Sequence, residues 1–261
     1  MKNFFLTGLP DRTDKPRNTG LTMVMDKGLS VREAENLAES GAAYVDLLKL
    51  GFGSACITPR LDDKLAVYRN AGMHVYFGGT LLEAFIERGN FNDYLRLLEK
   101  YKLSHAEISD GSITLSHNKK CEYIRQLKKY VTVLSEVGSK EEGILIHPVK
   151  WIEMMQRELE AGAWKVIAEA RESGTVGIYR PSGKAHVVLI NKIIAKVNPE
   201  DILWEAPQKS QQVYFIKMFG CNVNLGNIAP NEIIALESLR LGLRSDTFFQ
   251  FHKKADDYSA S

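Results

Sequence analysis

The feature that most constrains this chain is an alternation that repeats eight times along it. In each repeat, a short apolar run is followed by glycine and polar residues, and then by a segment whose apolar residues recur every three or four positions. Val31, Ala34, Leu37 and Ala38 show this spacing, typical of an amphipathic helix, in the first repeat. The predicted strands are residues 19–26, 44–50, 74–78, 105–109, 131–136, 164–168, 201–205 and 222–225.

Eight strands alternating with helices predict a closed parallel sheet. Strand–helix repeats form parallel sheets, and eight successive right-handed units close most economically into a (β/α)8, or TIM, barrel. The competing arrangement is an open, doubly wound sheet. A chain of 261 residues matches the roughly 250 residues that one such barrel uses. We therefore predict one α/β domain over residues 1–261, with an irregular N-terminal arm (1–18) and a C-terminal tail (248–261).

Two local patterns refine this prediction. Ser30 with Glu33, and Thr80 with Glu83, have the spacing of a capping box at a helix start. An additional helix is expected at residues 91–101, after the third strand.

Charge and composition exclude several classes of function. The chain has 34 Lys and Arg against 32 Asp and Glu, a net charge of +2, and the signs are interspersed. This balance disfavours binding to nucleic acid or to a membrane surface. No apolar run approaches the roughly 18 residues of a membrane span, and the first 16 residues lack the pattern of a signal peptide. The three cysteines form no Cys-x-x-Cys pair, so we expect a cytoplasmic protein with reduced thiols.

Polar groups stand at the ends of the predicted strands, where barrels place their reaction sites. Seven strands end in a group that ionises or hydrogen-bonds, and one ends in glycines. These groups are Asp26, Lys49, Gly78 with Gly79, Glu107 with Asp110, Glu136, Glu169, Glu205 and Asn224. Burying an unpaired charge costs several kcal/mol. Pairing with nearby lysines and arginines explains any single member, but a whole ring favours a functional site.

The acids and the cations of this region indicate different ligands. Carboxylates from adjacent strands, Glu136, Glu169 and Glu205, predict a site for Mg²⁺ rather than Zn²⁺, and the histidines show no ligand spacing. The cations suit a small substrate with more than one negative charge. They are Lys15, Arg17, Lys49, Lys140, Arg171, Lys209 and Arg244. Solvent exposure is the alternative for several of them, and Lys15 and Arg17 are also placed to cap the opposite barrel end.

Nine short segments, taken together and in order, resemble the phosphosulfolactate synthase family over roughly residues 15–247. They are Lys15-Pro16-Arg17, Asp46-x-x-Lys49-x-Gly51-x-Gly53, Gly78-Gly79-Thr80-Leu81-x-Glu83, Glu107-Ile108-Ser109-Asp110-Gly111, Glu136-Val137-Gly138-x-Lys140, Glu169-Ala170-Arg171-Glu172-Ser173-Gly174, Glu205-Ala206-Pro207, Asn222-Val223-Asn224-Leu225-Gly226-Asn227 and Leu243-Arg244-x-Asp246-Thr247. Phe52 and Ser54 stand where the family pattern has Trp and Thr, a departure that bears on substrate fit rather than on the fold.

The resemblance implies a (β/α)8 enzyme that adds sulfite to phosphoenolpyruvate with Mg²⁺, giving (2R)-2-phospho-3-sulfolactate. It also implies a homo-oligomer whose product serves coenzyme M biosynthesis or another use of sulfolactate. Sulfite is itself the nucleophile, so no activated Ser or Cys is needed. For the proton that must reach the neighbouring carbon we predict Lys140, with Lys49 second.

The remaining site residues are assigned to anion binding. Arg17, Arg171 and Arg244 are predicted to bind phosphate and sulfonate. Gly226 and Asn227 are predicted to assist through free backbone N–H groups in a turn after the eighth strand.

Two alternatives stay open at this point. One is another phosphoenolpyruvate or sugar-phosphate lyase on the same barrel, with a different nucleophile. The other is a non-catalytic protein like the plant heat-stress-associated proteins, which resemble the same family. The intact ring of acids and cations argues against the second, because a protein without catalysis is free to lose it.

Overall fold

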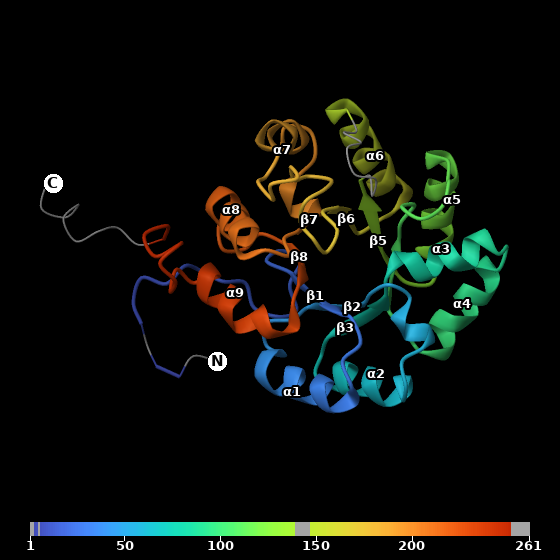
Figure 1. Cartoon of the computed structure of the whole chain (residues 1–261), viewed down its shortest axis with the longest axis horizontal. Helices are drawn as coiled ribbons and strands as arrows, with labels where there is room; N and C mark the ends of the chain where they lie inside the picture. The colour runs from blue at the N-terminus through green and yellow to red at the C-terminus, as the bar shows by residue number, and fades with distance from the viewer. Residues whose placement is uncertain (1–2, 5, 139–146, 252–261) are drawn as a thin grey trace, which may run out of the picture.

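The computed structural model of the chain describes residues 3–4, 6–138 and 147–251, and eight parallel strands form a barrel at its centre (Figure 1). The strands are β1 (Thr22–Asp26), β2 (Leu47–Leu50), β3 (His74–Phe77), β4 (His105–Ile108), β5 (Thr132–Val137), β6 (Lys165–Ala168), β7 (Ile202–Glu205) and β8 (Leu225–Ile228). Their order is β3-β2-β1-β8-β7-β6-β5-β4, with parallel pairing throughout. Within the described chain, no ladder of backbone hydrogen bonds joins β3 to β4, so the barrel is nearly closed.

Helices surround the barrel and cover its outer face (Figure 1). They are α1 (Val31–Gly41), α2 (Leu61–Asn70), α3 (Gly79–Glu87), α4 (Phe91–Lys100), α5 (His117–Leu127), α6 (Pro148–Ala161), α7 (Val187–Ile194), α8 (Lys209–Phe219) and α9 (Ile233–Arg240). The predicted TIM barrel and the additional helix, here α4, are confirmed. None of the described helices is long and apolar enough to span a membrane.

The prediction for the eighth strand is wrong by three residues. Residues 222–225 precede β8 or begin it, and Asn224 lies at the amino end of the barrel, where its side chain accepts the N–H of Leu21 at 3.1 Å. Gly226, predicted in a turn, lies inside the strand. A Cβ at Gly226 would lie 2.3 Å from Leu203 Cδ2 and 2.9 Å from Met23 Cε. Glycine is therefore required here by close packing in the barrel interior, not by a turn.

A layer of apolar side chains crosses the barrel interior and separates its two ends. Six strands each contribute one buried residue to it: Met23, Leu47, Tyr76, Leu134, Ile167 and Leu203. A second, larger core fills the space between the strands and the helices. Because the layer closes the middle of the barrel, any ligand site lies at one end or the other.

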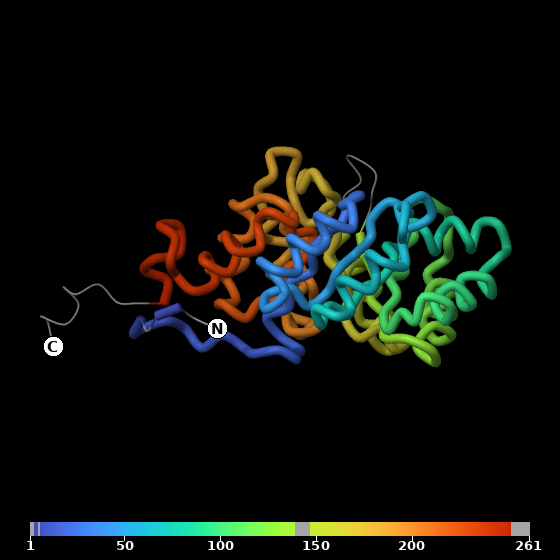
Figure 2. Tube along the Cα trace, turned by 90° about the horizontal axis from the view of Figure 1, so that it is seen from below, coloured from blue at the N-terminus to red at the C-terminus, as the bar shows by residue number. Residues whose placement is uncertain are grey.

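The N-terminal arm runs along the underside of the barrel (Figure 2). Lys15 Nζ donates hydrogen bonds to the carbonyl oxygens of Ala42 (3.0 Å), Val45 (2.5 Å) and Gly72 (3.1 Å). Arg17 Nε lies 2.9 Å from Asp46 Oδ1, and both side chains are buried. These contacts fasten the arm to the amino ends of the strands.

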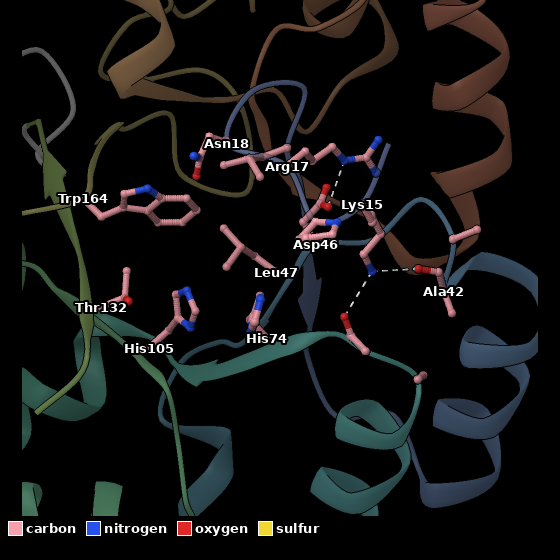
Figure 3. Close-up of a pocket in the computed structure, with 15 residues that line it drawn as sticks. Lys15, Arg17, Asn18, Ala42, Asp46, Leu47, His74, His105, Thr132 and Trp164 are labelled. Atoms are coloured by element: carbon pink, nitrogen blue, oxygen red, sulfur yellow. Dashed lines mark hydrogen bonds and ion pairs between the residues drawn. The ribbon is translucent and has the colours of Figure 1, made fainter. Parts of the chain in front are cut away.

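Two histidine rings pack against each other at the same end of the barrel. The ring centroids of His74 and His105 are 4.6 Å apart, and that of Trp164 is 5.7 Å from His105. With Lys15 and Arg17, the three rings line a cavity of about 800 Å³ (Figure 3). Burial lowers the pKa of His105 to about 4, and burial and then the charge of Lys15 lower the pKa of His74. Both rings are therefore predominantly neutral at pH 7.

We predict that acid destabilises the barrel through His105. Its pKa falls from 6.5 to about 4 on folding, so the unfolded chain binds the proton first as the pH drops through this window. The free energy of unfolding of the wild type should fall by about 3 kcal/mol more than that of His105→Phe between pH 7 and pH 4. Urea unfolding at a series of pH values measures this. Identical pH dependence of the two proteins would contradict it.

Candidate active site

A cavity of about 580 Å³ opens at the carboxyl ends of the strands. It is lined by Met25, Lys49, Phe52, Gly78, Thr80, Glu107, Gly111, Ser112, Glu136, Glu169, Arg171, Glu172, Ser173, Glu205 and Asn227. Members of the predicted ring of strand-end residues thus come together from β2, β4, β5, β6 and β7, whereas Asp26 and Asp110 pair with Lys64 and Lys120 instead. This is the end of the fold at which barrel enzymes hold their substrates.

Lys49 lies among the carboxylates of this cavity. Its Nζ is 2.8 Å from Glu107 Oε1, 3.5 Å from Glu136 Oε2 and 3.9 Å from Glu205 Oε1, and only 7% of its side chain is exposed. Burial alone lowers the pKa of Lys49, but the three carboxylates outweigh it and hold the pKa well above its ordinary value. Lys49 therefore keeps its proton and supplies a fixed positive charge, which opposes its predicted second-choice role as proton donor.

Negative charge exceeds positive charge around the cavity. Five of its described lining side chains are acidic and two, Lys49 and Arg171, are basic. Burial, and then the charge of Glu136, raise the pKa of Glu205 to about 7. Because the substrates implied for this site are themselves anions, the cavity needs further positive charge or protons before it binds them.

The donor chemistry of the cavity fits magnesium. Carboxylate oxygens are the ligands that Mg²⁺ prefers, and it is usually held by one or two carboxylates together with water and substrate oxygens. Glu107 Oε2 is buried and has no hydrogen-bond partner among the described residues. No three acidic, histidine or cysteine side chains of the described chain are grouped as a ready metal site. The predicted set of Glu136, Glu169 and Glu205 thus shares one cavity without forming a compact ligand group.

Unusual backbone conformations gather at this cavity. Five described non-glycine residues have positive φ, and three of them line it: Phe52 (56°), Arg171 (53°) and Asn227 (55°). Such conformations cost free energy and tend to cluster where a side chain must be aimed at a ligand. Asn227 Oδ1 is buried without a hydrogen-bond partner in the described part of the chain, so an amide group is available inside the cavity.

Helix α3 begins at the rim of the cavity. The N–H of Gly79 donates to Glu107 Oε1 at 2.8 Å, and a Cβ at Gly79 would lie 2.2 Å from Ser109 Oγ. Only glycine allows this close approach. The predicted capping box of Thr80 and Glu83 is wrong, because the N-cap of the helix is Gly78, two residues before Thr80.

Glu83 instead holds the loop that follows β4. Its carboxylate accepts hydrogen bonds from Ser109 Oγ and from the N–H groups of Gly111 (3.2 Å) and Ser112 (2.6 Å). Gly111 and Ser112 line the cavity. Glu83 does not line the cavity itself, but it fixes the position of a loop that does.

Three predicted site residues that the structure describes do not line the cavity. Arg17 lies at the amino end of the barrel beside Asp46 (Figure 3). The alternative prediction, that Arg17 caps this end of the barrel, therefore fits it better than anion binding. Arg244 donates to the carbonyl oxygen of Ala235 in α9 at 3.5 Å. Gly226 is in β8 and does not line the cavity. Lys140 lies outside the described residues.

Glu107 is a cavity residue that the sequence prediction left without a role, and Tyr76, which does not line the cavity, interacts with it from the barrel interior. Tyr76 pairs in register with Lys49 and points into the barrel, where burial and then the charge of Glu107 raise its pKa well above the ordinary value. The period-two alternation of β3 and β4 was the available signal, since it puts both residues on the interior face.

Comparison with known proteins agrees with the geometry. The sequence pattern of the (2R)-phospho-3-sulfolactate synthase family matches residues 10–246. The chain belongs to this family. Phosphosulfolactate synthase of Methanothermobacter thermautotrophicus is 41% identical over 249 residues, which cover 93% of this chain and 96% of that one. The Bacillus subtilis protein of the same name is 38% identical over 250 residues, covering 95% and 99%.

Family membership confirms that the chain is an enzyme with small phosphorylated substrates. Protein HEAT-STRESS-ASSOCIATED 32 of Arabidopsis thaliana is less similar, at 26% identity over 259 residues and 88% of each chain. Among solved structures, 3-hexulose-6-phosphate synthase from Salmonella typhimurium has a TM-score of 0.57 at 13% identity, covering 89% of this chain and all of that one. A likeness at this identity shows the barrel fold alone.

We predict that Lys49→Met destabilises the protein by about 3 kcal/mol, because it leaves buried carboxylates without their cation. The double variant Lys49→Met/Glu107→Gln should recover part of this loss. As a control, Lys209→Met removes a half-exposed ion pair with Asp246 and should cost less than about 1 kcal/mol. Urea unfolding measures all three. Equal losses for Lys49→Met and Lys209→Met would refute the central role of Lys49.

Proposed function

We propose that the cavity at the carboxyl end adds sulfite to phosphoenolpyruvate, giving (2R)-2-phospho-3-sulfolactate. The observation that carries the proposal is the position of Lys49 Nζ within 3.9 Å of Glu107, Glu136 and Glu205, in a chain of this family and at the reacting end of a TIM barrel. The other phosphoenolpyruvate or sugar-phosphate lyases stay a second candidate with no observation that favours them.

The chemistry joins two anions and a proton. The sulfur lone pair forms a carbon–sulfur bond at the methylene carbon, and the double-bond electrons move toward the substrate carboxylate. A proton then adds to the carbon that carries the phosphate, and no bond to phosphorus breaks. The step that needs help is the accumulation of negative charge, which Lys49 and Arg171 stabilise from fixed positions in the cavity.

Glu136, Glu169 and Glu205 are the residues that we propose as holding Mg²⁺. When bound, the ion supplies positive charge that neutralises oxygens of the substrate. The excess of five acidic over two basic lining side chains supports a cation here. Arg171, in the loop after β6, and Asn227, in β8, then orient the phosphate or the sulfonate.

We propose Lys140 as the proton donor. Lys49 is poorly suited, because the surrounding carboxylates raise its pKa. Lys140→Ala should lower turnover by about a hundredfold or more, the scale of a lost general acid, and leave phosphoenolpyruvate affinity nearly unchanged. Steady-state kinetics and calorimetry measure the two effects. Lys150→Ala, an exposed position on α6, is the control, and wild-type turnover in Lys140→Ala would exclude the assignment.

Arg171→Ala tests anion binding. Loss of a charge-assisted hydrogen bond costs about 1.5–3 kcal/mol, so KM for phosphoenolpyruvate should rise by roughly 10- to 100-fold. Arg32→Ala, on the exposed side of α1, should change nothing. If Arg171→Ala loses turnover while its affinity for phosphoenolpyruvate stays at the wild-type value, the residue does not bind the substrate anion.

We further propose a cytoplasmic homo-oligomer. Cys121 and Cys221 are buried free thiols, which supports a reducing compartment. Native mass spectrometry measures the oligomeric state directly.

The direct test of the reaction is product formation from phosphoenolpyruvate and sulfite, followed by mass spectrometry. We expect a product that retains phosphate, in the presence of Mg²⁺ and not after chelation. Glu136→Gln should raise the Mg²⁺ concentration that gives half-maximal activity, because it removes a proposed carboxylate ligand. No product from folded protein under any metal condition would overturn the proposed function.

A further inference from the structure

The candidate active site has a single apolar corner. Among its described lining residues, only Met25 and Phe52 carry apolar side chains, and the others are glycine, polar or charged. Met25 lies in β1 and is 5% exposed, whereas Phe52 follows β2 and is 56% exposed. Met25 pairs in register with Lys49, so this corner lies next to the buried ammonium.

The loop that carries Phe52 is fixed against β1. The N–H of Gly51 donates to the carbonyl oxygen of Asp26 at 3.1 Å, and a Cβ at Gly51 would meet Met25 Sδ at 3.3 Å. The N–H of Ser54 closes the turn onto the carbonyl oxygen of Gly51 at 2.9 Å. Phe52 therefore lies on a firmly held loop, next in sequence to the glycine that approaches Met25.

The needs of the fold do not explain why a bulky aromatic residue stands at position 52. Its φ of 56° lies in the left-handed region, which disfavours bulky residues, and glycine would fit this turn without strain. Its exposure means that the ring contributes little to the core. A strained backbone and an exposed aromatic ring at a cavity rim together indicate a ligand contact.

We propose that Phe52, together with Met25, receives the methylene carbon of phosphoenolpyruvate and limits the size of any substituent on it. This inference rests on the proposed function. The carboxylate and phosphate of that substrate need the charged part of the cavity, and its methylene group is its one apolar part. Burying it against Phe52 and Met25 releases water from apolar surface and turns the reacting carbon toward this corner. Phe52 is thus a specificity-determining residue.

The test compares two substrates in the full-length enzyme. The second is the phosphoenol form of 2-oxobutyrate, which carries one additional methyl group on the reacting carbon. In Phe52→Gly, kcat/KM for phosphoenolpyruvate should fall, mainly through KM, and the preference for phosphoenolpyruvate over its homologue should shrink by about tenfold or more. The melting temperature should stay equal or rise, because glycine relieves the positive φ.

Two further variants make the result specific. Ile57→Ala removes an apolar side chain that is 83% exposed in the same loop but does not line the cavity, and it should leave both substrates unaffected. Phe52→Trp should sharpen the preference for phosphoenolpyruvate. An unchanged preference in Phe52→Gly, or an equal change in Ile57→Ala, would overturn the inference.

Failure of the proposed reaction is distinguishable from failure of this inference. If the wild type forms no product, calorimetry with both phosphoenol compounds measures the same preference as a ratio of dissociation constants. A ratio that shrinks in Phe52→Gly supports the proposed contact between Phe52 and the methylene group, even without turnover. A ratio that stays constant, or no binding of either compound, overturns it.

Discussion

The candidate site depends on one buried ammonium among buried carboxylates. Lys49 on β2 faces Glu107 on β4, Glu136 on β5 and Glu205 on β7, so a single positive charge links four strands of the barrel. Desolvating these groups is costly, and the cost is offset only when the partners stay close. The interaction therefore fixes the spacing of the strand ends, and it leaves an excess of negative charge that a metal ion or bound protons would balance.

Glu107 also contributes to the closure of the barrel between β3 and β4. No backbone ladder joins β3 to β4 in the described chain, and side chains make the seam instead. At the carboxyl end, Glu107 accepts a hydrogen bond from the N–H of Gly79, and at the amino end the rings of His74 and His105 pack against each other. The site and the closure of the fold thus share one carboxylate, which couples stability to the geometry of the cavity.

Much of this arrangement was predictable from the sequence, because local and global signals agree. The eightfold alternation predicts the barrel, and acids at successive strand ends predict which side chains meet. The errors arose where tertiary packing overrides a local pattern. Gly226 and Asn227 have the composition of a turn, yet β8 needs a glycine beside Leu203. The charge of Arg17 suits an anion, but the path of the arm brings it to Asp46 at the other end.

The two ends of the barrel offer a clear contrast for an experiment. Both hold cations, but Lys15 and Arg17 are occupied by protein carbonyls and by Asp46, whereas Lys49 and Arg171 line the acidic cavity. The most direct measurement is a crystal structure with phosphoenolpyruvate and Mn²⁺, which replaces Mg²⁺ and is located by anomalous scattering. We expect the metal beside Glu136, Glu169 or Glu205 and the substrate within reach of Lys49 and Arg171. Phosphoenolpyruvate bound instead in the cavity beside Arg17 and His74 would contradict the assignment of the active site.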